Sequence, residues 1–544
     1  MAHALSRRAR LPVALLGAAA LLSSLTACSD DDSDASTGAS GNPSATSGGD
    51  HSGGTLTLAY AAGAGCIDPH QLADALTITV GRQFTDSLTF QDPDSGEIVP
   101  ALAESWDISP DGTSYTFHLR TGATFSDGTP VDAAAVKANI EDLVDLGARS
   151  LIGSSYVAGL KSADVVDPKT VTVTFASPSA QFLQATSTAT MGLLAASTLS
   201  ADPDARCAGK LIGSGPFVID KYVTDQSVAL SKRADYDWAP PSIATHTGPA
   251  YLDHVTFQVI AEASVRTGAL QSDQVQGVEN LQPVDQPVLK SAGFNVLARS
   301  NPGVVNVLIP NVKRPALSDV NVRKALQIGI DRKAIIDTLW NDNYTAATSV
   351  LAHTTPYYTD ESSLLAYDPD GAKQLLDDAG WTVGSDGIRE KDGQRLTLSV
   401  LVAPAEFELL QQQFKAIGVD LQTRGIDPAQ YVDFLNKGDY DLAPYNLTRP
   451  DPAVLTALFS STLQNVPHFT TGPLDQQLAQ LAQVSDADQR TSIAADIQRA
   501  IIADGYALPT TEQSQVYGFS PAVKDIYLEA SSRVYLYGTW LDKD

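Results

Sequence analysis

The sequence PALAESWDISPDGTSYTFHLRTGATFSDGTP, which runs from Pro100 to Pro130, carries the strongest structural signal in this chain. Tyr115, Phe117 and Leu119 alternate with polar residues, and successive side chains of a β-strand point to opposite sides. The tripeptide PDG at 110–112 is a turn signal just before them. The stretch therefore predicts a tight turn that leads into a strand with one buried face.

Further strands are predicted on both sides of this stretch. Alternation of apolar and polar residues, or a short run of β-prone residues, marks 55–60, 171–175, 216–220, 227–231, 252–260 and 304–309. Asp132 can cap a helix that runs to about Asp145, because its carboxylate can accept from the free backbone N–H groups of the first turn. The first half is therefore predicted to be rich in strands.

The second half alternates helices with strands. Helical patterns cover 319–330, 331–340, 369–379, 405–416, 428–436, 474–484 and 487–503, and strand patterns cover 396–402, 419–423 and 440–442. Because the two halves differ in character, we expect two separate lobes with a boundary close to Val304–Asn311. Trp106 and Trp381 are expected to pack in the cores, which large aromatic side chains dominate.

The N-terminus reads as an export signal. Three arginines (Arg7, Arg8 and Arg10) precede an apolar run at 11–22, which is shorter than the roughly 20 residues that a spanning helix needs. The sequence Leu-Thr-Ala-Cys that ends at Cys28 resembles the bacterial lipobox, and this resemblance implies cleavage before Cys28 and lipidation of its side chain. The alternative is an ordinary secretory signal followed by a chance cysteine.

The segment after Cys28 predicts a tether. Residues 29–54 contain small and polar residues and no large apolar ones, so they cannot bury enough surface to offset the entropy cost of ordering. The formal net charge of −27 argues against nucleic acid as a partner, because binding nucleic acid requires a cationic surface.

The chain contains three cysteines: Cys28, Cys66 and Cys207. If Cys28 carries a lipid, two thiols remain in an oxidising compartment, where paired thiols tend to oxidise. We therefore expect a Cys66–Cys207 disulfide. The alternative is a pair of buried free thiols.

Catalytic and metal-binding motifs are missing from the sequence. It contains no G-x-S-x-G, H-E-x-x-H, P-loop or C-x-x-C pattern, and no two of its eight histidines are three or four residues apart. We predict no catalytic residue, no metal site and no cofactor, and we expect that the protein is not an enzyme.

Several blocks follow Pro100–Pro130 in a fixed order: Gly213–Phe217, Val322–Leu326 with Ile330–Arg332, Ala372–Leu376 with Ala379–Trp381, and Tyr440–Asp441 with Asp451–Pro452. Together they resemble the signature of the family 5 extracellular solute-binding proteins, which are the oligopeptide-, dipeptide- or nickel-binding components of ABC importers. The resemblance covers essentially all of residues 55–540.

The resemblance implies an α/β fold of the periplasmic-binding-protein type (type II, cluster C), a two-lobed clam with an extra subdomain in the first lobe. The implied organisation is a lipoprotein signal peptide (1–27), a lipidated cysteine and disordered tether (28–54), the first lobe (55–304), the second lobe (305–506) and a return to the first lobe (507–544). Such proteins close on a solute between the lobes and deliver it to a permease.

Candidate ligand-binding residues lie where loops and hinge strands should face the space between the lobes. They are Tyr60, Asn306, Asn311, Tyr445, Asn446, Arg449 and Asp451. Peptide-binding relatives often place Gly-Trp and then an Asp, which pairs with the peptide amine, before the Asp-Pro pair. This chain has Tyr445-Asn-Leu-Thr-Arg-Pro450 there, so Arg449 is predicted to receive a carboxylate or phosphate instead.

The sequence therefore predicts a lipid-anchored solute-binding subunit of an ABC importer, at the outer face of the cytoplasmic membrane or in the periplasm, that captures oligopeptides or a peptide-like solute. Its expected partners are the solute, the permease subunits and, through its lipid, the membrane; we expect a monomer. The alternatives are the same fold with an oligosaccharide or a metal chelate, a secreted peptide hydrolase, and a signalling or adhesion lipoprotein that has no permease.

Overall fold

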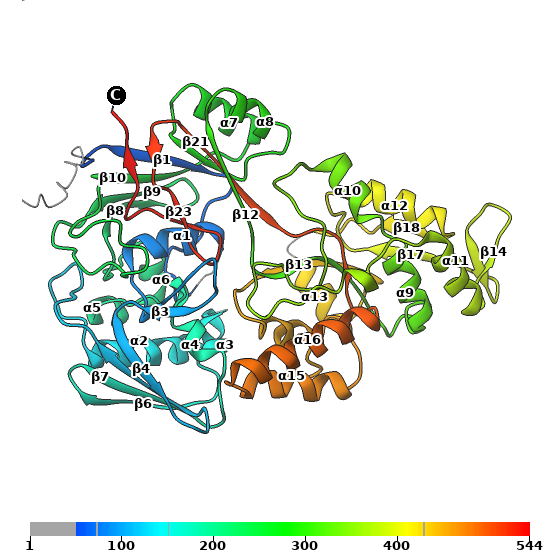
Figure 1. Cartoon of the computed structure of the whole chain (residues 1–544), viewed down its shortest axis with the longest axis horizontal. Helices are drawn as coiled ribbons and strands as arrows, with labels where there is room; N and C mark the ends of the chain where they lie inside the picture. Colours follow the sequence, from blue (N-terminus) through cyan, green and yellow to red (C-terminus); the bar gives the residue numbers. More distant parts are fainter. Residues whose placement is uncertain (1–50, 72–73, 151, 428–429, 544) are drawn as a thin grey trace, which may run out of the picture. The chain divides into compact units, whose positions relative to one another are not determined.

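Both ends of the chain contribute strands to one seven-stranded sheet (Figure 1). The structure is a computed structural model that describes residues 51–71, 74–150, 152–427 and 430–543, so the predicted signal peptide, Cys28 and nearly all of the tether lie outside the described residues. In spatial order the strands are β12 (Asn295–Ser300), β21 (Ser514–Phe519), β11 (Gly277–Glu279), β1 (Thr55–Tyr60), β10 (His254–Val259), β9 (Ser227–Lys232) and β8 (Phe217–Val223).

A four-stranded antiparallel sheet holds the Pro100–Pro130 stretch. Its order is β4 (Ala103–Ile108), β5 (Ser114–Leu119), β7 (Thr170–Phe175) and β6 (Leu160–Asp167). The predicted face of β5 is buried: Tyr115, Phe117 and Leu119 join the same hydrophobic core as the seven-stranded sheet. The predicted turn is also present, with Gly112 at a φ of 66°. The two sheets and their helices are called the first lobe below.

Helices of the first lobe start at side-chain caps. Asp132 accepts from the backbone N–H of Ala135, as expected, and α2 then buries Val136, Ile140 and Leu143. Asp74 caps α1 in the same way. The helices of this lobe are α1 (Ala75–Phe84), α2 (Ala133–Leu146), η1 (Gly147–Arg149), α3 (Gly153–Tyr156), α4 (Phe182–Ala185), η2 (Ala189–Met191), α5 (Ala196–Leu199), α6 (Pro203–Cys207), α7 (Ala263–Gln271) and α8 (Gln286–Ser291).

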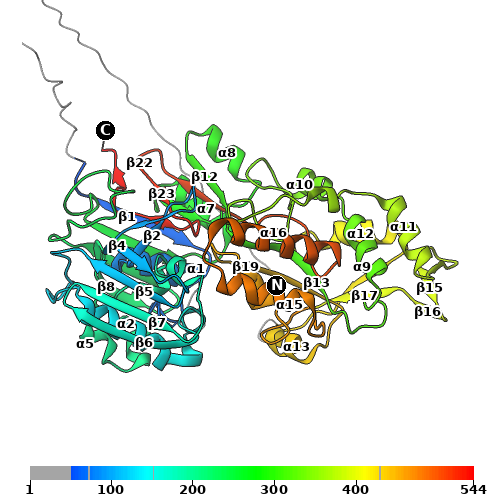
Figure 2. The same ribbon diagram turned by 60° about the horizontal axis from the view of Figure 1, so that its bottom comes forward.

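A smaller core lies at the β12 edge of the seven-stranded sheet. Figure 2 shows α7 and α8 beside this edge, where Leu270 and Leu289 pack with Val278 of β11. Three two-stranded antiparallel sheets complete the first lobe. They are β2 (Thr89–Gln91) with β3 (Ile98–Pro100), β22 (Val523–Lys524) with β25 (Trp540–Leu541), and β23 (Tyr527–Leu528) with β24 (Val534–Tyr535).

The second lobe is built on a five-stranded sheet. Its order is β18 (Asp420–Thr423), β17 (Thr397–Val400), β19 (Leu442–Thr448), β13 (Gly303–Pro310) and β20 (Leu508–Pro509). A separate small sheet directly precedes β17 in the chain and consists of β14 (Thr382–Val383), β15 (Arg389–Lys391) and β16 (Gln394–Arg395). The parallel pair of β17 and β18 is joined through α12, the short crossover helix that parallel strands require.

The helices of the second lobe follow the predicted order. They are α9 (Val320–Ile328), α10 (Arg332–Leu339), η3 (Ser362–Leu364), α11 (Pro369–Asp378), α12 (Phe407–Ala416), α13 (Tyr431–Lys437), α14 (Val454–Phe459), α15 (Pro473–Gln483) and α16 (Ala487–Ala503). Two hydrophobic cores, one centred on α9, α11 and α12 and one on α14, α15 and α16, hold them against the sheet.

The chain crosses between the lobes twice. Only Asn301 and Pro302 separate β12 from β13 on the outward crossing, and the return crossing joins β20 to β21. The two crossings are tied together, because the Asn301 backbone N–H donates to the Gln513 carbonyl at 2.7 Å. Gly303 has a φ of 114°, and a Cβ there would lie 2.1 Å from the Leu447 carbonyl oxygen, so only glycine fits this position.

The two tryptophans behave differently. Trp381 is buried in the second lobe, as expected. The expectation for Trp106 is only partly correct, because this side chain is half-buried against the first core. Trp106 lies on β4, an edge strand of the four-stranded sheet.

Candidate functional site

A cavity of about 90 Å³ lies between the two lobes. The first lobe lines it with Asp74 and Arg82 of the α1 region, Tyr156 of α3, Gln184 of α4 and Arg533, and the second lobe lines it with the segment Thr448–Pro450 at the end of β19. The lobes also touch directly nearby. The Gln91 amide donates to the Pro450 carbonyl at 3.3 Å, and the Ala180 backbone N–H donates to the Ala482 carbonyl at 3.0 Å.

Arg449 is the second-lobe charge in this cavity. Its residue is 7 % exposed, and its guanidinium lies 5.2 Å from the centre of the Tyr156 ring. One Nη atom donates to Ser155 Oγ at 3.5 Å, whereas Nε has no hydrogen-bond partner among the described residues. A buried guanidinium without a carboxylate is unfavourable. A negatively charged group that entered the cavity would satisfy it.

The opposite wall is partly satisfied by contacts within the first lobe. Arg82 Nε is paired with Glu529 at 2.7 Å, and another of its nitrogens donates to the Ser187 carbonyl at 2.6 Å. Arg533 donates to Gln515 Oε1 at 2.8 Å. Burial raises the pKa of Asp74, although the backbone N–H of Thr77 donates to this carboxylate. Arg449 and Arg533 are therefore the two arginines of this cavity that form no ion pair with a described residue, and Arg449 is the more buried of the two.

Asp451 lies close to Arg449 in sequence but is already used. Its carboxylate pairs with Arg490 of α16 at 2.8 Å and accepts from the Ala453 backbone N–H at 2.8 Å. Both charged residues are buried. Asp451 therefore braces the loop that carries Arg449, and it lines a second, larger cavity.

Three other predicted ligand residues share a pocket of about 460 Å³ in the second lobe. Asn446 donates from its side-chain amide to Asn306 Oδ1 at 3.0 Å, and Asn306 donates in turn to Thr511 Oγ1 at 3.0 Å. Tyr445 donates to Gln464 Oε1 at 3.2 Å, and burial raises its pKa. Trp340 and Glu406 line the same pocket.

The remaining two predicted residues line none of these three cavities. Tyr60 is buried at the end of β1, where its ring packs against Phe257 and burial raises its pKa. Asn311 donates to the Gly438 carbonyl at 2.8 Å and accepts from the Lys313 backbone N–H at 3.0 Å. Asn311 therefore holds a loop of the second lobe in place and lies outside the proposed site.

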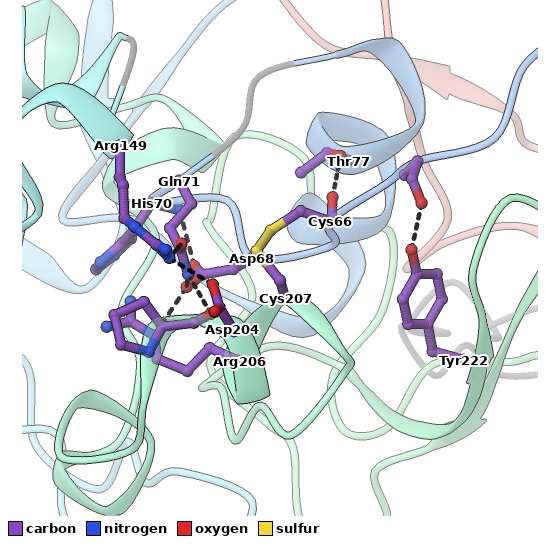
Figure 3. The surroundings of a disulfide bond; sticks show 12 residues. Cys66, Asp68, His70, Gln71, Thr77, Arg149, Asp204, Arg206, Cys207 and Tyr222 are labelled. Carbon is purple, nitrogen blue, oxygen red and sulfur yellow. Dashed lines mark hydrogen bonds and ion pairs between the residues drawn. A yellow bond between two sulfur atoms is a disulfide. The ribbon is translucent and has the colours of Figure 1, made fainter.

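A disulfide joins Cys66 to Cys207 at the end of α6 (Figure 3). The Cys66 carbonyl accepts from Thr77 Oγ1 at 2.6 Å, so the segment before α1 is bonded both to α6 and to α1 itself. Because Asp74 lies in this region and lines the cavity, the disulfide helps to fix one wall of the site.

A buried network of charges surrounds the disulfide. Arg206 pairs with Asp68 at 2.8 Å and with Asp142 at 2.7 Å, as Figure 3 shows for the first of these partners. The two ring nitrogens of His70 lie 2.7 Å from Asp142 Oδ2 and 2.9 Å from the Gly192 carbonyl oxygen. Both partners are hydrogen-bond acceptors. The network was not foreseen from the sequence, since its members are far apart in the chain.

In the part of the chain that the structure describes, no group of three or more His, Cys, Asp or Glu residues is placed to hold a metal ion. The helices of that same part include none with the length and apolar character needed to cross a membrane.

Comparisons with known proteins identify the group to which these features point. Residues 97–465 match the family described as bacterial extracellular solute-binding proteins, family 5. A glutathione-binding protein, GsiB from Shigella dysenteriae, is 26% identical over 468 residues, which cover 84% of this chain and 88% of that protein. GsiB from Escherichia coli K12 is also 26% identical, over 473 residues and the same shares of both chains.

Solved structures show the same fold. NikA from Brucella suis in complex with Fe(III)-EDTA has a TM-score of 0.78 at 25% identity, covering 90% of this chain and all of that one. DppA from Helicobacter pylori in complex with the peptide STSA has a TM-score of 0.72 at 22% identity, covering 90% of this chain and 98% of that one. The predicted two-lobed α/β fold is therefore confirmed.

Proposed function

Because this chain belongs to the bacterial extracellular solute-binding proteins of family 5, we propose that it captures a peptide or peptide-like solute between its two lobes for import. Proteins of this family are the solute-binding components of ABC transporters, they work with ABC permeases outside the cytoplasm, and they are not enzymes. A closed state that touches the solute from both lobes is favoured to the extent that it binds the solute more tightly than the open state does.

The buried guanidinium of Arg449 is the observation that carries this proposal. Its Nε–H is unpartnered among the described residues. GsiB is a glutathione-binding protein, and the similar DppA and NikA structures are complexes with a peptide and with Fe(III)-EDTA. All three solutes carry carboxylate groups, which the planar fork of arginine binds well. We therefore assign Arg449 as the group that holds the solute carboxylate.

Substitution of Arg449 tests the assignment. Native mass spectrometry of wild-type protein mixed with glutathione and pooled random tetrapeptides selects the solute. Arg449→Gln should then bind the selected solute about ten- to a hundredfold more weakly, because a hydrogen bond to a charged group contributes about 1.5–3 kcal/mol. Calorimetry measures the change.

Two controls sharpen this test. Arg395→Gln removes an exposed arginine of the small sheet, whose side chain is 43% exposed, and should leave affinity unchanged. A C-terminally amidated form of the same peptide lacks the carboxylate, so it should bind wild type more weakly than the free acid does. This loss of affinity should be similar to the loss that Arg449→Gln shows for the free acid. Equal affinities of Arg449→Gln and wild type for the acid would refute the role of Arg449.

We also propose that the protein is a lipoprotein anchored through Cys28, which lies outside the described residues. Cys28→Ala should shift the protein from the membrane fraction to the soluble fraction of cells, because two acyl chains or their equivalent are needed for stable anchoring. Fractionation with an immunoblot measures the shift. A wild-type protein whose intact mass shows a plain, unacylated N-terminus would contradict the proposal.

We propose the lobe boundaries expected from the sequence, with the first lobe at 55–304 and from 507 onwards and the second lobe between them. The pairing of β20 with β13 favours a return crossing that begins only after Pro509. We also propose that residues 28–54 form a tether and that the protein is a monomer.

A further inference from the structure

The 460 Å³ pocket of the second lobe is separate from the Arg449 cavity, because no described residue lines both. We call it the aromatic pocket, since Trp340, Tyr431 and Tyr445 line it. Its walls come from the end of α10, the start of α12, α13, β13 and β19, which all belong to one lobe. Pockets that enclose a small ligand measure about 300–1,000 Å³. The aromatic pocket therefore has the size of a complete small-ligand site.

The three aromatic side chains keep part of their surface open. Trp340, Tyr431 and Tyr445 are each half-buried. Trp340 stacks on Tyr344 with 4.6 Å between the ring centres, and this contact holds the indole in place. The Tyr431 hydroxyl donates to a backbone carbonyl, and the Tyr445 hydroxyl donates to Gln464 Oε1. The three rings are therefore fixed in position without a ligand.

Among the described residues that line this pocket, Glu406 alone carries a charge. Its Oε1 accepts from Thr510 Oγ1 at 2.7 Å, whereas no described residue donates to Oε2 or forms an ion pair with the carboxylate. Glu406 lies at the start of α12, where the helix dipole favours a negative charge but does not neutralise it. The residue is 5% exposed, so water screens its charge weakly. The pocket therefore has a negative potential that no cation of the described chain compensates.

Aromatic surface together with one carboxylate favours an organic cation as the ligand. A cation within about 6 Å of a ring centre is attracted by the negative face of the π system. The negative charge of Glu406 adds to this attraction and repels an anion. A metal ion fits the pocket poorly, because Ca²⁺ takes about six to eight oxygen ligands and a single carboxylate lines this site.

We propose that the aromatic pocket binds an organic ammonium group, with Glu406 supplying the charge and the rings of Trp340, Tyr431 and Tyr445 supplying the walls. This inference goes beyond the proposed function, because the site shares neither residues nor ligand charge with the carboxylate site at Arg449. The ammonium group belongs either to a free small cation or to the basic side chain of a larger solute, and the experiment distinguishes the two sources.

Pairs of probes that differ in charge but not in shape test the proposal. Choline and 3,3-dimethylbutan-1-ol form the first pair, and the tripeptides Ala-Lys-Ala and Ala-norleucine-Ala form the second. Calorimetry on the whole protein measures all four affinities. We expect the cationic member of at least one pair to bind tenfold or more tightly than its neutral analogue. Preference within the first pair identifies a free small cation, and preference within the second pair alone identifies a basic side chain.

Substitution of Glu406 separates charge from shape. Glu406→Gln should weaken binding of the preferred cation at least tenfold and change binding of its neutral analogue by less than twofold. Glu408→Gln is the matched control, because Glu408 is an exposed residue of α12 and does not line the pocket. It should leave both affinities unchanged.

Substitution of Tyr431 tests the ring itself. Tyr431→Leu removes the aromatic face and should weaken the cation at least fivefold. Tyr431→Phe loses the hydroxyl bond but keeps the ring, so it should retain most of the wild-type affinity. Circular dichroism melts confirm that each variant is folded.

The outcomes separate this inference from the proposed function. If neither cation binds better than its neutral analogue, or if Glu406→Gln and Glu408→Gln bind the cation equally well, the inference is wrong. Peptide binding that depends on Arg449 would still stand in that case. If wild type binds choline in a manner that depends on Glu406 but binds no peptide, the proposed peptide solute fails and the inference stands.

Discussion

Removal of the Cys66–Cys207 disulfide is expected to lower the free energy of unfolding by up to about 5 kcal/mol. The bridged residues are 141 apart in sequence, so the bond strongly restricts the unfolded chain. The folded state keeps its other restraints on the same segment, because Arg206 still pairs with Asp68 and Thr77 still bonds the Cys66 carbonyl. The loss should therefore act mainly through the unfolded chain.

Denaturant titration of a Cys66→Ser/Cys207→Ser double variant measures this loss. Wild type treated with a thiol reductant under denaturing conditions and refolded in its presence provides a second route to the same state, and the two midpoints should agree. The double variant also avoids the new free thiol that a single substitution would leave. A midpoint equal to that of oxidised wild type would show that the bond does not stabilise the protein.

Arg206→Met should cost about 3–5 kcal/mol, because it leaves buried carboxylates without their cation. The arginine and Asp68 side chains are 1% and 0% exposed, and Asp142 is 11% exposed. Methionine fills similar space but makes no ion pair. Arg149→Met is the matched control, since Arg149 pairs with Asp204 in the same region with a 52% exposed side chain and such pairs contribute about 0–1 kcal/mol. Equal losses in the two variants would contradict this account.

The network around Arg206 should also make the stability of the protein depend on pH in the acidic range. Burial raises the pKa of Asp142, but hydrogen bonds from His70 and Arg206 outweigh it and hold the pKa at about 2, against an ordinary 3.8. A depressed pKa contributes stability that is present above the unfolded value and is lost as pH falls through the folded value. Wild type should therefore lose this contribution between about pH 4 and pH 2, whereas Arg206→Met should show a weaker dependence in that range. Thermal melts across this range measure it.

Local patterns predicted much of the fold. The alternation at Thr55–Tyr60 matches β1 residue for residue, and the Asp132 cap begins α2 as expected. β4 gave no clear alternation because its pairing with β5 shifts register between Ala103 and Ser105. Such a bulge turns the side chains that follow to the opposite face, and the period of two is lost.

The site was less predictable than the fold. Arg449 stood out because a charged residue replaced the expected pattern before an Asp-Pro pair, and it lines the inter-lobe cavity. Glu406 and Trp340 gave no signal, since one lies at the start of an ordinary amphipathic helix and the other at the end of another. Only tertiary packing brings them to one pocket, so their chemistry cannot be deduced from neighbours in sequence.

The position of β21 has a consequence for folding. This strand lies between β12 and β11 in the sheet, yet it follows every other strand of that sheet in the sequence. Until it arrives, both neighbours present open backbone edges, which invite pairing with strands of other molecules. Truncation before Ser514 is therefore expected to cause aggregation, because it removes the strand that covers both edges.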